Sequence, residues 1–205
     1  RDYGGQDNQI GLEQSPEEYV NQLVEVFSGV RDCLADDGTL WVNIGDGYYN
    51  YKSGTGEYAK QSFAKGRQDL PYKNPKRANK LEGYKDKDLI GAPWMFAFAM
   101  RANGWWLRQD IIWSKPNPMP ESVRDRCTKS HEYMFLFSKS RDYYFDVDSI
   151  KIPTVDGEGL KRKKSVWDVK IKPYKEAHFA TYPSELIEPC ILAGSEKGDI
   201  VLDPF

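Results

Sequence analysis

Hydrophobic and polar positions follow two different periods along the chain, and these periods predict its main helices and strands. Between Ser15 and Leu34, apolar residues recur every three or four positions, which is typical of an amphipathic helix with one buried stripe. Ser15 is the expected N-cap, Pro16 takes the first helical position, and Glu18 completes a capping box. The apolar stripe consists of Val20, Leu23, Val24, Phe27, Val30 and Leu34.

Shorter apolar runs predict strands and two further helices. Residues 39–44 form a compact β run, and a helix followed directly by such a strand favours an α/β sheet. Residues 89–100 are apolar on nearly all sides, which predicts a buried helix ending at Asn103-Gly104. A third helix is expected over 183–193 with a tolerated internal proline. Other strands are expected at 105–113, 132–139 and 166–169, and as a buried parallel strand at 200–202.

Two long segments show neither period. Residues 47–88 are rich in Gly, Lys, Tyr and Asn, and a loop of that length inside a compact domain is uncommon unless it is functional or disordered. Residues 147–177 are polar and basic. We therefore predict one domain over 1–205, with a long basic loop at 47–88 and a separate element at 147–177.

Composition narrows the class of protein. A chain of 205 residues with 40% apolar and 29% charged residues is an ordinary globular composition and long enough for one α/β domain. No apolar run approaches the roughly 18 residues that a membrane span needs, and no signal peptide is recognisable. We expect a cytoplasmic protein with no membrane partner.

Cysteine and histidine usage excludes two kinds of site. Cys33, Cys127 and Cys190 are odd in number and widely spaced, so neither a disulfide framework nor a paired-cysteine zinc site is available. His131 and His178, the two histidines, have no neighbouring cysteine. The sequence therefore predicts a reducing compartment and no metal site.

The net charge of −2 conceals an uneven distribution. Residues 1–46 hold two basic and ten acidic side chains, whereas 47–88 hold ten basic against five acidic and 151–177 hold eight against four. Solvated surface accounts for one such segment, but two that also carry aromatic residues and proline indicate a polyanionic partner.

Several motifs stand in a recognisable order. Asp203-Pro204-Phe205 follows the last apolar run, where α/β proteins place ligand sites, although turn chemistry alone also favours a carboxylate there. It is preceded by the segment 178–183 and a helix. Upstream lie Gln9–Glu13, Asp37–Asp46, Ile112–Asn117, Arg124–Arg126 and Ser130–Tyr133. In this order the chain resembles the β-type, permuted amino-methyltransferases of DNA, with residues 47–80 and 147–165 lacking counterparts.

The resemblance implies a Rossmann-like, three-layer α/β methyltransferase fold with a mostly parallel sheet, incomplete in this chain. It also implies S-adenosylmethionine as the cofactor, and the cofactor-binding residues that it assigns are His178, Phe179, Ala180, Thr181, Asp203, Pro204 and Phe205. Asn43, Gly45 and Asp46 would form the active-site edge of the same crevice, and a strand-end Asx turn is the alternative for the two polar residues.

DNA contacts are expected from the proline-rich stretch after residue 114 and from the basic run in the element at 147–177, which would belong to a target-recognition region. A solvated loop and a flexible basic linker are the respective alternatives, and His131 also suits a hydrogen-bonded strand position. The candidate DNA-binding residues are Lys115, Asn117, Ser122, Arg124, Arg126, Lys129, His131, Lys161, Arg162, Lys163 and Lys164.

The sequence departs from the family pattern in one respect that matters for catalysis. The family's catalytic tetrapeptide contains Pro-Pro before an aromatic residue, and no Pro-Pro pair occurs here, so the catalytic residues are expected before residue 1. The implied function is a site-specific, prokaryotic or phage-encoded methyltransferase acting on cytosine N4 or adenine N6 of a flipped base in double-stranded DNA. A cognate restriction endonuclease is a further candidate partner. A non-catalytic DNA-binding remnant and an RNA or protein methyltransferase are the alternatives.

Overall fold

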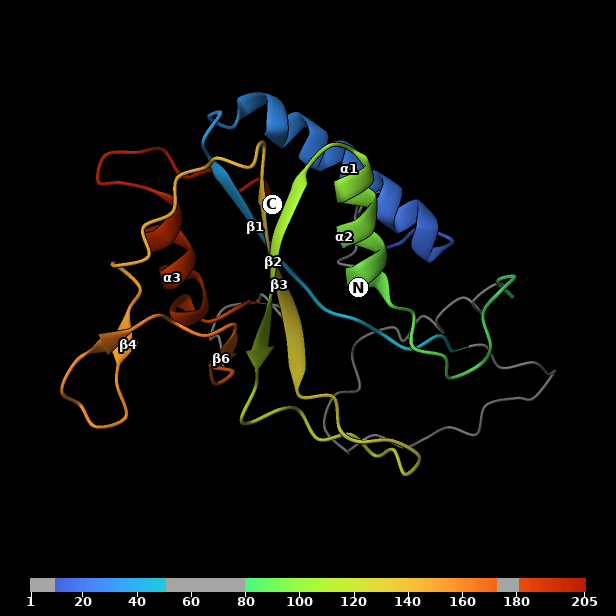
Figure 1. The fold of residues 1–205 in the computed structure, drawn as a ribbon. Coiled ribbons are helices and arrows are strands. Elements are labelled where there is room, and N and C mark those ends of the chain that lie inside the picture. Colours follow the sequence, from blue (N-terminus) through green and yellow to red (C-terminus); the bar gives the residue numbers. More distant parts are fainter. Residues whose placement is uncertain (1–9, 51–79, 173–180) are drawn as a thin grey trace, which may run out of the picture.

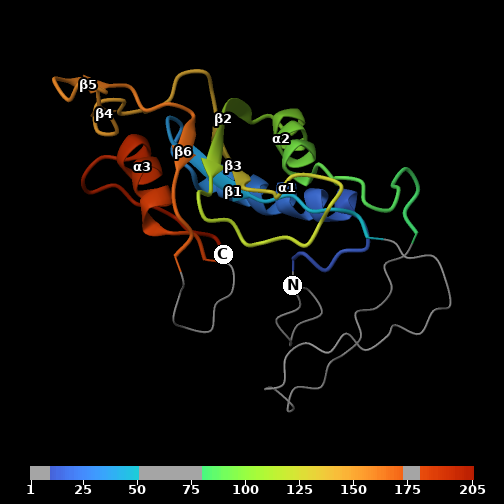
Figure 2. The ribbon, with the colours of Figure 1, turned by 90° about the horizontal axis from the view of Figure 1, so that it is seen from below.

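The computed structural model describes residues 10–50, 80–172 and 181–205, and these residues form a three-layer α/β arrangement. Helices α1 (Pro16–Cys33) and α2 (Ala92–Ala102) lie on one side of a sheet, and α3 (Ser184–Gly194) lies on the other (Figure 1). The view from below shows the same three layers (Figure 2). This layering matches the predicted fold class.

The main sheet has the strand order β1-β3-β2-β6, with β1 (Thr39–Ile44), β2 (Trp106–Ser114), β3 (His131–Ser138) and β6 (Val166–Asp168). We expected a mostly parallel sheet, and the described sheet is mixed instead. The central strand β3 is antiparallel to both β1 and β2, and only the pairing of β2 with β6 is parallel. The cause is the connection between β2 and β3, a loop without a helix, because a parallel pair usually needs a helical crossover.

Helix α1 begins as its sequence predicts. Ser15 is the N-cap, and its hydroxyl accepts a hydrogen bond from the Glu18 backbone N–H at 3.2 Å. The Glu18 carboxylate in turn accepts the backbone N–H of Gln14 at 2.9 Å, one residue before the position that a standard capping box uses. The start of α2 differs from the prediction, because Gly91 has a φ of 76° and delays the first helical residue to Ala92.

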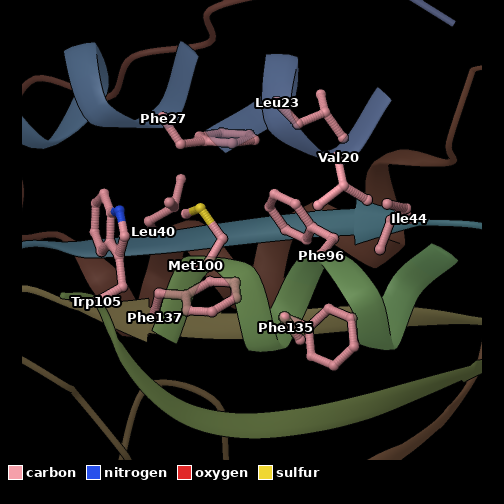
Figure 3. Close-up of a cluster of buried hydrophobic side chains, with 11 residues drawn as sticks. Val20, Leu23, Phe27, Leu40, Ile44, Phe96, Met100, Trp105, Phe135 and Phe137 are labelled. Carbon is pink, nitrogen blue, oxygen red and sulfur yellow. The ribbon is translucent and has the colours of Figure 1, made fainter. Parts of the chain in front are cut away.

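The largest core lies between α1, α2 and the sheet (Figure 3). Phe135 and Phe137 of β3 face this cluster, while Met134, the residue before Phe135, faces a second cluster beneath α3. Burial on both faces explains why β3 is an almost continuous apolar run rather than an alternating one. The core residues labelled in the figure are Val20, Leu23, Phe27, Leu40, Ile44, Phe96, Met100, Trp105, Phe135 and Phe137.

Backbone hydrogen bonds join the segment after β1 to the segment before α2. Tyr49 N–H donates to the Asp88 carbonyl, and its own carbonyl accepts the Lys87 N–H, both at 2.8 Å. The Ile90 N–H donates to the Gly47 carbonyl at 3.0 Å. We call this pairing of residues 47–49 with 87–90 the stem ladder. It brings the two ends of the predicted basic loop together, and residues 51–79 of that loop lie outside the described residues.

Two features of the C-terminal half differ from the sequence prediction. A short hairpin of β4 (Ile152–Pro153) and β5 (Leu160–Lys161) lies within the polar element at 147–177. The buried strand expected at 200–202 is wrong, because Ile200 is 96% exposed and the segment has no strand geometry. A strand needs a neighbour for its backbone groups, and no described strand pairs with these residues.

Candidate functional site

The carboxylate of Asp46 connects the end of β1 with the start of α2. Its Oδ1 accepts the backbone N–H groups of Gly47, Gly91 and Ala92 at 2.9, 3.0 and 3.2 Å. Gly91 has no side chain to cap α2, so Asp46 supplies the missing acceptor and places a negative charge at the positive end of the helix dipole. The side chain is only 3% exposed, and its Oδ2 lies 3.9 Å from Nζ of Lys129.

The other two residues of the predicted active-site edge also have structural partners. The Asn43 side chain donates from Nδ2 to the Tyr133 carbonyl at 3.0 Å, which ties β1 to β3. Gly45 passes beneath Glu132, and a Cβ atom there would lie 3.3 Å from the Glu132 side-chain carboxyl carbon. The structure thus places Asn43, Gly45 and Asp46 along one strand end, against β3 and α2.

Residues 115–130 connect β2 to β3, and we call them loop 115–130. Lys115 at its start forms an ion pair with Glu132, and its Nζ also lies 4.2 Å from the ring centroid of Trp113. The Lys115 side chain is 14% exposed. The amino group therefore has an internal partner and a cation–π contact.

The far side of loop 115–130 is held against the stem ladder. Arg126 donates from Nη1 to the Glu121 carboxylate at 2.6 Å, and its guanidinium lies 3.9 Å from the Tyr48 ring centroid. Lys87 of the ladder bonds Asp125 at 2.6 Å. The hydrogen bond from Arg126 lowers the pKa of Glu121, and that from Lys87 lowers the pKa of Asp125. With Lys129 beside Asp46, these contacts fix the loop in one position.

Asn117 binds a different neighbour. Its carboxamide oxygen accepts the backbone N–H of Ile171 at 2.9 Å, and its Nδ2 donates to the carbonyl of the same residue at 3.0 Å. The indole N–H of Trp113 donates to the Val169 carbonyl at 2.8 Å. Loop 115–130 is therefore also joined to the chain that follows β6.

The remaining candidates in loop 115–130 are more open. Ser122 and Arg124 are exposed, and neither has an ion-pair partner among the residues that the structure describes. His131 is half-buried at the start of β3, and its ring packs edge-on against Tyr133 at 5.5 Å.

The basic run 161–164 lies elsewhere. Lys163 has its Nζ 5.0 Å from the centroid of the Trp167 ring, and Lys161 is half-buried in β5. Arg162 and Lys164 are exposed. Because β2 and β6 run parallel, this run precedes the paired segment while loop 115–130 follows it. Both ribbon views show the β4–β5 hairpin apart from loop 115–130 (Figures 1 and 2).

At the C-terminal end, Asp203 lies beside Tyr182. Burial, and then the charge of Asp203 and its hydrogen bond, raise the pKa of Tyr182, so the phenol stays protonated and donates to the carboxylate. Thr181 is exposed next to this pair, and Phe205 packs edge-on against Phe27 of α1 at 5.9 Å. Asp203, Pro204 and Phe205 are exposed, while His178, Phe179 and Ala180 lie outside the described residues.

Three other kinds of site have little support in the described ranges. Within residues 10–50, 80–172 and 181–205, no group of three His, Cys, Asp or Glu side chains is arranged to hold a metal. No helix there is long and apolar enough to cross a bilayer. Cys190 is buried, and burial raises its thiol pKa to about 12, so it is a core residue rather than a nucleophile.

Comparison with known proteins decides the family. A model described as DNA methylase matches residues 2–205. The chain belongs to this DNA methylase family. Over its whole length it is 50% identical to the type II methyltransferase M.Cfr9I of Citrobacter freundii and 49% identical to M.SmaI of Serratia marcescens. The chain covers 65% of the former protein and 68% of the latter.

A solved structure shows the same fold. The PvuII DNA methyltransferase (cytosine-N4-specific) superposes with a TM-score of 0.63, covering 95% of this chain and 60% of that protein, at 15% sequence identity. The DNA methylase family and this superposition together confirm the Rossmann-like methyltransferase fold predicted from the sequence.

Sequence reasoning missed the partners that hold this family member's loop. Glu121 and Tyr48 hold Arg126, and Glu132 holds Lys115, so two cations that the sequence assigned to DNA have partners inside the protein. Tyr182 was not singled out although it lies beside Asp203. One signal was present: Glu121 and Asp125 lie in the same loop as the cations, so acidic partners for them were available nearby in the sequence.

Proposed function

We propose that this protein is an S-adenosylmethionine-dependent DNA methyltransferase that modifies cytosine N4 or adenine N6. The observation that carries the proposal is the match to the DNA methylase family over residues 2–205, with about half of all positions identical to type II methyltransferases. The chain spans about 65% of the length of M.Cfr9I, so activity is assigned to the complete protein.

Methyl transfer to a base amino group depends on how the base and the methyl donor are oriented, more than on covalent catalysis by the protein. A base amino group is a poor nucleophile because its lone pair is delocalised, and the base must leave the stacked duplex before it can react. Bound S-adenosylmethionine supplies a methyl group on a positively charged sulfur, which transfers to an amine held in line with it. The protein therefore has to bind the methyl donor, hold the flipped base and keep the amino nitrogen in line with the methyl group. No catalytic residue is assigned within the 205 residues, which contain no Pro-Pro pair.

The residues near the C-terminal end fit the cofactor chemically. Asp203 offers a carboxylate that can accept hydrogen bonds from hydroxyl groups of the cofactor and balance the positive charge of its sulfonium. Tyr182 donates to that carboxylate and orients it. Thr181, Pro204 and Phe205 supply polar and apolar surface next to it, and His178, Phe179 and Ala180 remain part of the proposal by resemblance.

DNA is proposed to lie across the exposed cations of loop 115–130 and of the run 161–164. Arg124, Arg162 and Lys164 are exposed and suited to phosphate contacts, and Ser122 is suited to a hydrogen bond with the backbone. Lys115, Arg126 and Lys129, with internal partners, give the loop a fixed shape. The element at 147–177 is proposed as part of the target-recognition region.

The proposed setting is a bacterial restriction-modification system. The relatives are type II methyltransferases from bacteria, which supports a cognate endonuclease as the partner enzyme and the cytoplasm as the compartment where both meet DNA.

The test is methyl transfer by the complete protein. It is incubated with S-adenosylmethionine labelled in the methyl group and with plasmid DNA, and the DNA is digested to nucleosides for chromatography. We expect label in N4-methylcytosine or N6-methyladenine. A parallel reaction offers RNA in place of the plasmid. Label found only in RNA, or retention of DNA without any label, would overturn the proposal in favour of an RNA enzyme or a binding remnant, respectively.

A further inference from the structure

Asn117 has an unusual double contact. Its carboxamide donates to and accepts from the backbone of a single residue, Ile171, at 3.0 and 2.9 Å. This arrangement imitates one step of a strand ladder, with a side chain in place of the second backbone. The substitute is needed there because prolines at 116, 118 and 120 cannot donate backbone hydrogen bonds.

The contact prolongs the pairing between β2 and β6. The Val169 N–H donates to the Ser114 carbonyl at 3.0 Å, one residue beyond the end of the ladder, and the Trp113 indole holds the Val169 carbonyl at 2.8 Å. Asn117 then fixes Ile171. Three successive contacts therefore hold residues 169–171 in register with the start of loop 115–130.

The fixed segment leads directly to the cofactor side. Lys172, the next residue, forms an ion pair with Glu185 in the first turn of α3. Tyr182 lies just before that turn, and its hydroxyl bonds Asp203. Two described contacts and two short stretches of chain thus lead from Asn117 to Tyr182, which lies beside the carboxylate that we propose to face the cofactor.

We infer that Asn117 is a positioning residue that couples the DNA-binding loop to the cofactor-binding edge. The inference rests on the proposed function and deepens it. Both polar groups of the carboxamide are engaged by Ile171, so a bidentate contact to a base through the same edge would require breaking both hydrogen bonds. A loop displaced by DNA shifts Ile171, and a bound cofactor favours the loop position that Asn117 holds.

The experiment compares Asn117→Ala and Asn117→Asp with the wild type in the complete protein. The Asp variant keeps the acceptor for the Ile171 N–H but sets an oxygen against the Ile171 carbonyl, so both variants lose the double contact. We expect the Kd for S-adenosylhomocysteine, and the KM for S-adenosylmethionine, to rise about fivefold or more in both. The Kd for DNA without cofactor is expected to stay within about twofold of the wild-type value, since site coupling rather than DNA contact is lost.

Asn103→Ala is the matched control. Asn103 is an exposed amide at the C-cap of α2, remote from Ile171, and this variant should keep wild-type values for all three constants. Combining Asn117→Ala with Tyr182→Phe should raise the Kd for S-adenosylhomocysteine by less than the product of the two single effects, because the two residues act on one path.

Two outcomes overturn the inference. If Asn117→Ala weakens DNA binding without changing cofactor affinity, Asn117 is a direct DNA contact. If all three constants rise and the Tm falls in both variants, the role is general folding. A wild-type protein that binds S-adenosylhomocysteine but methylates no DNA would refute the proposed function alone, and the cofactor affinities would still test Asn117. A wild-type protein that binds no S-adenosylhomocysteine would overturn both.

Discussion

The two basic regions of the described chain use their charges in different ways. In loop 115–130, Lys115, Arg126 and Lys129 all face acidic or aromatic partners inside the protein. In the run 161–164, Arg162 and Lys164 are exposed and form no ion pair among the described residues. A count of lysine and arginine predicts DNA binding for both regions equally. The contacts distinguish cations that hold the shape of a loop from exposed cations that form no ion pair among the described residues.

The difference has a physical origin in the neighbours of each region. Loop 115–130 lies against the stem ladder and the capped start of α2, which supply Tyr48, Lys87 and Asp46. The run 161–164 follows a two-residue strand of a small hairpin, and the nearby aromatic surface that it contacts is Trp167. A region with many neighbours satisfies its own charges, and a projecting region leaves them to solvent or to a ligand.

Removing Asp46 should have the largest effect, because it breaks the anchor of loop 115–130. Asp46→Ala leaves two N–H groups at the start of α2 without their acceptor and Lys129 without its partner. We expect the free energy of unfolding to fall by about 2 kcal/mol, the upper range for a helix cap with a favourable charge. Urea denaturation of the complete protein measures this.

Asp46→Asn serves as the control for charge. The amide keeps an acceptor for the helix N–H groups and loses only the interaction of the charge with the helix dipole and Lys129. Asp46→Asn should therefore destabilise the protein about half as much as Asp46→Ala does. A stability loss below about 0.5 kcal/mol in Asp46→Ala would show that the loop and α2 are held by other contacts.

Neutralising the exposed cations should affect DNA binding and not folding. For the double variant Arg162→Ala with Lys164→Ala, the negative slope of log K against log salt should decrease in magnitude by about 1.8, as expected for the loss of two phosphate contacts. Fluorescence anisotropy with a duplex at several salt concentrations measures the slope, and the Tm should remain unchanged. An unchanged slope would assign the run to solvated surface and remove the contrast between the two regions.

The smallest effect sharpens the comparison inside loop 115–130 itself. Arg124 is exposed, while Arg126 is bonded to Glu121 and stacked on Tyr48. Arg124→Ala should decrease the magnitude of the salt slope by about 0.9 with no change in Tm. Arg126→Ala should instead increase protease cleavage within the loop. Equal behaviour of the two variants would contradict the division into free and shape-holding cations.

Local signals were sufficient for much of the fold. The cap at Ser15, the compact run of β1 and the helix around Pro189 follow the predicted positions, because each is set by residues within one or two turns of chain. The β4–β5 hairpin was not predicted, although Asp156-Gly157 is a turn signal and Gly157 has a φ of 77°. Strand pairing was the weak point, since an apolar run at 200–202 cannot specify its neighbour.

The candidate site was harder to predict because its contacts are distant in sequence. Asp46 caps a helix that begins 46 residues later, and Asn117 bonds a residue 54 positions away. The residue types predict that both side chains form hydrogen bonds, but only the folded chain shows which partner each side chain takes. The same holds for Arg126, whose stacking partner Tyr48 lies far away in sequence, at the start of the predicted basic loop 47–88.

The stem ladder bears on how relatives of this protein can diverge. Its backbone hydrogen bonds join Gly47 and Tyr49 to residues 87–90, so these bonds do not depend on which side chains stand there. Once the ends of a loop are fixed, each doubling of its length costs only about 0.6 kcal/mol of closure entropy. Evolution can therefore lengthen, shorten or replace this insertion while the sheet, the helices and loop 115–130 keep their places.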